Sequence, residues 1–185
     1  AASEDELADY FEPCMRDIIN YFAHSSSRKL HLSQSQEELG LEVLQMLRYV
    51  VTRWLSRGEA TLRIYRNYPA LVKDFGEDSS SGCAITNLNT MLSQKFVSSL
   101  CFFADFLERQ NTVSRIFQHA HVCIRDLKQT VDMIRKSIET LYLGQTFLGG
   151  SRFRKLQSAM TADRGEFEFE QVPLICNMEE HTWVM

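Results

Sequence analysis

The sequence predicts an all-α fold: a helical bundle whose main feature is a long antiparallel helix hairpin over about residues 84–142. Three observations lead to this class. The 185 residues contain only 3 Pro and 8 Gly, which leaves few of the turns that a many-stranded sandwich or barrel needs. Hydrophobic residues make up 44% of the chain, enough for a buried core. Many of them recur at steps of three and four, the period of an amphipathic helix.

A chain of this length most often forms one domain, so we expect a single helical segment over residues 1–185. N-terminal helices and a linker occupy 1–52, further helices occupy 53–160, and an acidic tail or partial strand occupies 161–185. The sequence opens on a polar, acidic stretch without Met, which is typical of a segment of something longer.

Two helices are expected first. The apolar positions of the first one share a face: Leu7, Phe11, Cys14, Ile18 and Tyr21. Pro13 lies inside this pattern and kinks or restarts the helix, because proline lacks the backbone donor. The serine run 25–27 then caps a second helix, from about Arg28 to Gly40.

The next segment is ambiguous. Residues 41–52 mix helical spacing with a β-branched close, and we expect 48–53 to be extended. Helical spacing returns from Leu55 to Phe75 and stops at Gly76, with Pro69 bending or ending that helix.

The hairpin is predicted from two stripes, each a series of apolar residues that share one face of a helix. One stripe runs from Ile85 to Leu107, and the other runs from Val113 to Leu141. Asn111 and Thr112 are expected to cap the second helix. Because few residues join them, the two helices should pack antiparallel. We expect this hairpin to be the core of the chain, with Ile124 and Leu127 inside it.

A short basic helix is expected over 152–159, after the glycines near residue 150. Residues 165–170 then alternate Glu and Phe with the period of a strand, and we find no pairing partner for it within this chain.

Charge is unevenly distributed, although the net charge is only -4. Residues 1–13 carry five acids and no base, and residues 161–185 carry six acids and one base, so the middle of the chain is basic. The five cysteines are odd in number and widely spaced, which favours free thiols in a reducing nuclear or cytoplasmic compartment. No apolar window reaches the roughly 20 residues of a membrane helix, so no membrane partner is expected.

Residue chemistry predicts no active site, no cofactor and no metal. On a helix only His119 and Cys123 share a face, because His121 points in a different direction, and no second pair of metal ligands is visible. The acids fall in polar ends or loops. The glycine pair 149–150 lacks the Lys of a phosphate-binding loop.

The segment 51–60 differs from the rest. Trp54 stands between Arg53 and Arg57, and Arg63 and Arg66 follow in the same helix. An aromatic ring flanked by guanidinium groups can stack a nucleobase while neighbouring phosphates are held. The alternative is that Trp54 anchors the core and its arginines pair with acids.

This segment, Thr52-Arg53-Trp54-Leu55-Ser56-Arg57-Gly58-Glu59-Ala60 running into Tyr68-Pro69-Ala70-Leu71, resembles the Arg-Trp motif of hAT-superfamily transposases and of cellular genes derived from them. The resemblance extends over residues 5–160. It implies the helical insertion of a split RNase H-like domain, to which a strand at 165–170 would belong, and a protein with a dimerisation segment. It also implies that Trp54 stabilises a flipped base of a DNA hairpin, with Arg53 as the neighbouring motif residue.

The chain departs from the family where catalysis is concerned. It has no Cys-x-x-His element before Trp54 and no assignable set of three catalytic acids. Phosphodiester cleavage normally needs metals clamped by clustered carboxylates, so we expect no enzyme activity of this chain.

Two functions remain open besides that of an active nuclease or transposase, which the missing carboxylate cluster disfavours. The first is a non-catalytic helical fragment of an hAT transposase-like protein, which binds DNA, such as a hairpin or transposon end, or a protein partner through its basic middle. The second is a helical interaction module, in which the stripe over 113–141 pairs with a helical partner or forms a homo-oligomer.

Replacement of Trp54 by Ala separates the readings of that residue. A stacking indole contributes about 1–3 kcal/mol to hairpin-DNA binding, and its loss spares the fold. A core anchor costs about 3–5 kcal/mol of stability when it is truncated. We expect partial burial, because Leu55 and the helix that carries Leu62 must pack nearby. Thermal melts paired with hairpin-DNA titrations decide; a large drop in melting temperature without any DNA effect would exclude stacking.

Overall fold

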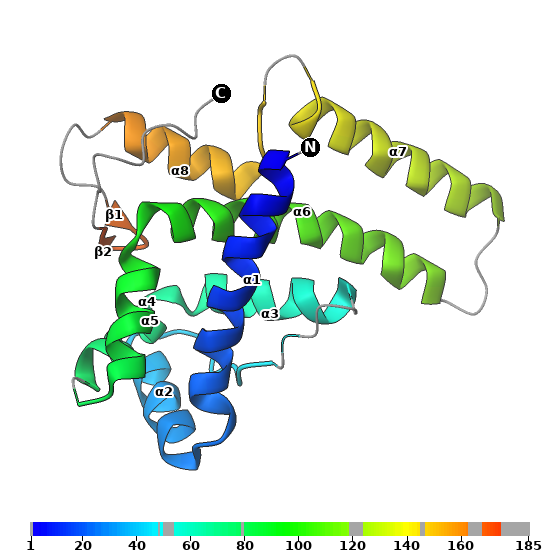
Figure 1. Cartoon of the computed structure of the whole chain (residues 1–185). Helices are drawn as coiled ribbons and strands as arrows, with labels where there is room; N and C mark the ends of the chain where they lie inside the picture. Colours follow the sequence, from blue (N-terminus) through cyan, green and yellow to red (C-terminus); the bar gives the residue numbers. More distant parts are fainter. Residues whose placement is uncertain are drawn as a thin grey trace.

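The computed structural model describes residues 2–47, 49, 54–78, 80–118, 124–144, 147–162 and 168–174. These residues confirm the all-α bundle (Figure 1). Its helices are α1 (Ala2–Ala23), α2 (Ser26–Glu38), α3 (Trp54–Arg66), α4 (Tyr68–Glu77), α5 (Gly82–Leu92), α6 (Gln94–Gln118), α7 (Ile124–Tyr142) and α8 (Ser151–Ala162). One small sheet pairs β1 (Glu168–Phe169) with β2 (Val172–Pro173).

The first two helices follow the predicted pattern. α1 continues through Pro13 and buries the side of the helix that carries Phe11 and Ile18. The Ser25 hydroxyl accepts a hydrogen bond from the backbone N–H of Arg28 and so caps α2. Gly40 follows the end of α2 with φ +65°, a left-handed conformation that suits glycine.

The helix expected over 55–75 is divided in two at Asn67. Pro69 occupies the first turn of α4, where its missing N–H costs no helical hydrogen bond. The Asn67 side chain donates to the Arg63 carbonyl (3.0 Å) and accepts from the Gln36 amide (2.9 Å), which fixes the junction. Residues 41–47 form neither helix nor strand. Arg48 and residues 50–53 of the predicted extended segment lie outside the described residues.

The hairpin is present, but its boundaries differ from the prediction. The first stripe is divided at Ser93, whose hydroxyl accepts from the Phe96 N–H (3.2 Å) at the start of α6. α6 then runs through Asn111, the predicted cap, to Gln118, and α7 begins at Ile124. Asn111 is buried against α3 within the continuing helix, so it caps nothing. α6 and α7 run antiparallel (Figure 1).

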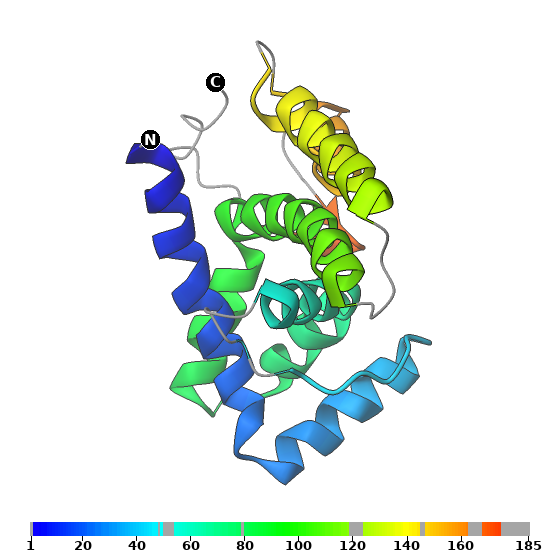
Figure 2. The same ribbon diagram turned by 90° about the vertical axis from the view of Figure 1, so that its right-hand side faces the viewer.

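Of the two hairpin helices only α6 belongs to the core, which it shares with residues of α1, α3, α4 and α5, and this corrects the expectation that both hairpin helices form it. α6 passes between α1 on one side and α7 with α8 on the other (Figure 2), and it makes its most extensive contact with α3. Phe11 of α1 stacks on Phe103 of α6 with 4.5 Å between ring centroids. No described side chain of α7 is fully buried, and Leu127 is half-buried. The side chain of Ile124 lies outside the described residues.

The strand near residue 168 does have a partner in the chain, contrary to the prediction. β1 pairs antiparallel with β2 through a two-residue turn, in which Glu170 and Gln171 both have positive φ. The buried ring of Phe169 packs edge-on against Tyr68 at 4.9 Å between centroids. This aromatic contact holds the two-stranded β-sheet against α4. The predicted short basic helix is present as α8.

Asp74 is a buried carboxyl group of α4, 5% exposed. Burial raises its pKa from the usual 3.8 to about 6, although the charge of His31 acts in the opposite direction. The folded state therefore holds this proton at pH values where the unfolded chain has released it. The resulting stabilisation grows as pH falls from about 7 to about 4, and above pH 6 the buried charge is a cost.

We predict that Asp74→Asn stabilises the protein at pH 7.5, by up to about 3 kcal/mol, because the amide replaces a buried charge. The advantage should shrink steadily as pH is lowered to 4.5. Urea unfolding of wild type and variant at several pH values measures it, with Asp17→Asn on the exposed side of α1 as control. A difference that does not change with pH would contradict the prediction.

Candidate nucleic-acid interface

Arg57, one of the predicted DNA contacts, is buried. Its guanidinium forms an ion pair with Glu12 of α1 at 2.6 Å, and its Nε donates to the Tyr49 hydroxyl at 3.3 Å. The side chain therefore joins α3 to α1 and to the segment before α3. This corrects its predicted role: Arg57 serves the fold and does not lie on an accessible basic strip.

Gly58, the next residue, sets the distance between α3 and α6. A methyl group at this position would overlap the side-chain amide of Asn111 in α6. Neither polar atom of that buried amide has a hydrogen-bond partner among the described residues. The glycine of the motif is thus required by the close helix crossing.

Arg63 and Arg66 stand in the last turn of α3, where a cation is favoured by the helix dipole. Arg63 Nη1 donates to the carbonyl of Gln45 at 2.6 Å. Arg66 is exposed, and no described acid lies within ion-pair distance of it. Of the three predicted arginines whose side chains the structure describes, these two are accessible to a ligand and Arg57 is not.

Arg152 brings a third guanidinium to the same region from the start of α8. Its Nη1 lies 3.0 Å from Asp105 and 2.8 Å from Glu108, both in α6. Asp105 also accepts the backbone N–H groups of Arg152 and Phe153 (2.9 and 3.0 Å), so a side chain of α6 caps α8. The guanidinium carbon lies 5.2 Å from the ring centre of Tyr65.

Glu108 lies within a field of three arginines. The hydrogen bond from Arg152 holds the pKa of Glu108 below its usual range, and the charges of Arg152, Arg66 and Arg109 act in the same direction. Arg109 also donates to Ser137 of α7 at 2.6 Å. Three arginines, two of them far from Glu108 in the sequence, therefore lie around this one carboxylate.

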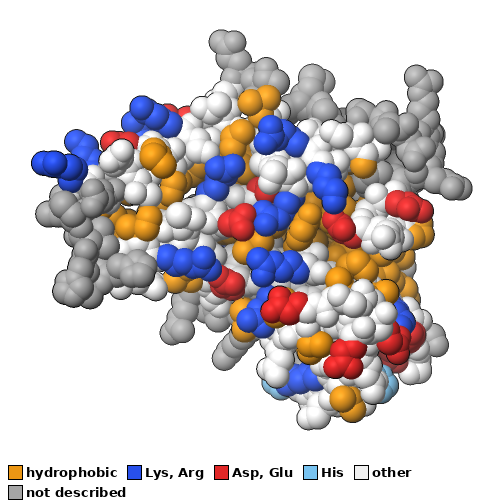
Figure 3. Space-filling view, turned by 180° about the vertical axis from the view of Figure 1, so that it is seen from behind, with side chains coloured by type: hydrophobic (Ala, Val, Ile, Leu, Met, Phe, Trp, Pro, Cys, Tyr) orange, Lys and Arg blue, Asp and Glu red, His pale blue; other side chains and the backbone are white. Residues whose placement is uncertain are grey.

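The helices of this region are together strongly basic. α3, α6 and α8 carry nine Lys and Arg against three Asp and Glu, whereas α1 carries six acids and one base. On the face turned away from α1, Lys and Arg side chains cross the middle of the surface with acids between them (Figure 3). We call the arginines at the end of α3, in α6 and at the start of α8 together the basic face: Arg63, Arg66, Arg109, Arg152 and Arg154.

The sequence did not identify Arg109 and Arg152 as part of a site. The excess of bases over 113–157 was a signal for the second, but nothing local relates either residue to α3. Arg53 and the side chain of Trp54 lie outside the described residues, so their predicted roles remain predictions. Trp54 does begin α3, one residue before Leu55, from which helical spacing was predicted.

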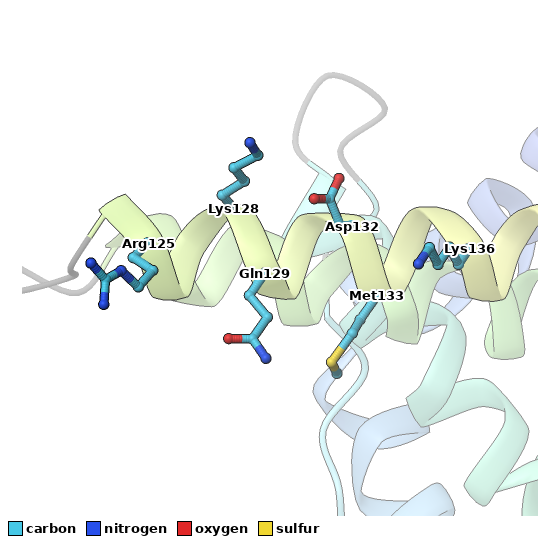
Figure 4. Close-up of a pocket in the computed structure, with 6 residues that line it drawn as sticks. All are labelled: Arg125, Lys128, Gln129, Asp132, Met133 and Lys136. Atoms are coloured by element: carbon cyan, nitrogen blue, oxygen red, sulfur yellow. The ribbon is translucent and has the colours of Figure 1, made fainter.

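The depressions along α7 offer no enclosed small-molecule site. One, of about 480 Å³, is lined only by that helix, and its side chains point to different sides (Figure 4). Lys128 and Asp132 point one way and Gln129 and Met133 the other. In the described part of the chain no three His, Cys, Asp or Glu side chains gather as metal ligands, and His119, His121 and Cys123 lie outside it.

No protein-family model, curated protein or solved structure matches this chain. Among the described helices, none is both long and apolar enough to cross a membrane.

Substitution of Gly58 tests the α3–α6 crossing. A Gly→Ala change inside a helix normally stabilises it by about 0.5–1 kcal/mol, and Gly76→Ala, in open space in α4, should do so. Gly58→Ala should instead lower the free energy of unfolding by about 1–3 kcal/mol, because Asn111 must move. Adding Asn111→Ala should recover most of that loss. Equal stabilisation by Gly58→Ala and Gly76→Ala in denaturant melts would contradict the crossing.

Proposed function

We propose that this chain is a non-catalytic helical domain of an hAT transposase-like protein that binds DNA through the basic face. The observation that carries the proposal is the convergence of arginines from three helices on the side away from the acidic α1. Arginine suits this role because its planar guanidinium binds phosphate oxygens in pairs and keeps its charge at every physiological pH.

The arginines differ in how readily they can meet a phosphate. Arg66 and Arg154 are exposed, and no described acid lies within ion-pair distance of either. Arg109 donates to a neutral serine, and Arg152 is held between two carboxylates. We therefore expect Arg66, Arg154 and Arg63 to make the phosphate contacts. Arg152 mainly holds α8 against α6 through its ion pairs with Asp105 and Glu108.

The length of α3 relates this face to the motif tryptophan. Trp54 and Arg66 stand at opposite ends of a helix of 13 residues, about 18 Å apart at 1.5 Å per residue. That span corresponds to roughly five nucleotides of one DNA strand at 3.4 Å each. A DNA hairpin whose end base stacks at Trp54 would thus lay its backbone along α3 toward the arginines, in agreement with the resemblance.

The acids of the basic face support a non-catalytic role. Glu59 pairs with Arg115, and Asp105 and Glu108 pair with Arg152. Carboxylates that hold catalytic metals must be available to the ions, whereas these are taken up by guanidinium groups.

We place the protein in the nucleus or cytoplasm, which agrees with the free thiols of Cys14, Cys83 and Cys101.

A second candidate function, contact with another protein, is favoured by one observation. Two large apolar side chains of the α6–α7 pair are exposed, Phe117 near the end of α6 (61%) and Met133 in the middle of α7 (62%). Exposed apolar surface is common at sites of protein association. The surface differs from the basic face and can function beside it.

Paired substitution of the two arginines in the last turn of α3 tests DNA binding. Arg63→Gln with Arg66→Gln should weaken binding to a duplex or hairpin oligonucleotide at every sequence. The slope of log affinity against log salt should flatten by about one unit for each lost phosphate contact. Arg16→Gln, which removes an exposed arginine from the acidic α1, is the control and should leave the slope unchanged. Equal slopes for all three proteins would overturn the proposal.

A further inference from the structure

The end of the α6–α7 pair is only half covered. We call residues 110–118 of α6 together with α7 the arm. Its α7 stripe consists of side chains that are all half-buried: Leu127, Val131, Ile134, Ile138 and Leu141. On α6, Val113 is half-buried and Phe117 is largely exposed. The apolar side chains of the arm that the structure describes are therefore all partly open to solvent.

Two helices alone rarely exclude water from the seam between them. A four-helix bundle does so, because each helix then places its apolar side against two neighbours. A second helix pair with the same stripes would complete that arrangement. The arm of a second copy of this chain has that composition.

The charges beside the stripe identify the occupant. Lys128, Asp132, Arg135 and Glu139 follow at steps of four, three and four, so they form one row along α7. Their signs alternate from basic to acidic. When the row is reversed every sign is inverted, so an antiparallel copy opposes Lys128 to Glu139 and Asp132 to Arg135, twice each across a two-fold axis.

A different partner fits this row less well. α7 carries four bases and three acids, a nearly balanced set that gives no strong attraction to a uniformly acidic or basic surface. The Arg135–Glu139 ion pair within the helix, at 3.2 Å, is exposed on both sides. Such a pair contributes little to stability and can be exchanged for contacts across an interface.

We propose that α7 packs antiparallel against α7 of a second copy of this chain, so that the two arms form a four-helix bundle around a two-fold axis. This inference rests on the second candidate function. It is independent of DNA binding by the basic face, because no residue of the charge row belongs to that face.

Charge substitutions in the purified chain test the proposal by sedimentation velocity over a concentration series. Lys128→Glu places like charges opposite each other twice in the dimer, and it should raise the dimer Kd by about tenfold or more. The double variant Lys128→Glu with Glu139→Lys exchanges the signs of each pair, and it should return the Kd to within about threefold of wild type. Lys136→Glu makes the same charge change outside the row and should leave the Kd within that range.

Several results would overturn the inference. They are a monomeric wild type at about 100 μM, a double variant as weak as the single one, and equal weakening by Lys136→Glu. Thermal melts of each variant exclude loss of folding as the cause, because all three substituted positions are exposed on α7. Titration of the same proteins with DNA shows separately whether the basic face still binds, so the two proposals fail independently.

Discussion

The close crossing of α3 over α6 is the constraint on which the rest of the structure depends. Gly58 allows the two backbones to approach, and Asn111 fills the space that a side chain at Gly58 would need. Arg57, one residue earlier, extends the junction to α1 through Glu12. On the next turns of α6, Asp105 caps α8. A single helix thus organises the core on one side and the basic face on the other.

The basic face follows from how the fold distributes charge. Acids are concentrated in α1, where Glu12 pairs with the buried Arg57, whereas Arg66 of α3 and Arg154 of α8 are exposed. Several acids on the basic face have structural partners, as Asp105 does with Arg152. What remains accessible is an excess of guanidinium groups on a rigid helical surface. The net charge of -4 therefore conceals an uneven distribution of charge over the molecule, and the proposed binding of DNA depends on that distribution.

Local signals predicted several elements well. The spacing around Phe11 and Ile18 predicted α1, and the serine cap with a later Gly40 predicted α2, because both signals act within a few residues. The hairpin turn could not be placed in this way. Asn111 followed by Thr112 has the composition of a helix cap, and only the contact with Gly58, more than 50 residues away, makes Asn111 an interior residue of α6.

The candidate site was predictable only in part, for the same reason. Arg57 and Arg66 look alike in the sequence, but the position of Glu12 decides which of them is buried. Arg152 joins the face because Asp105 caps its helix, a contact without local signal. The partner of β1 was missed because a two-residue strand has no period, and Glu170-Gln171 is not a usual sequence for such a turn.

Amide chemical-shift mapping during titration with a hairpin oligonucleotide at low salt tests the central claim most directly. Binding through the basic face predicts shifts that concentrate in the last turn of α3, around Arg109 and over residues 150–155, and that disappear as salt is added. Shifts centred on α1 or on the outer side of α7, or an unchanged spectrum at saturating DNA, would contradict the account.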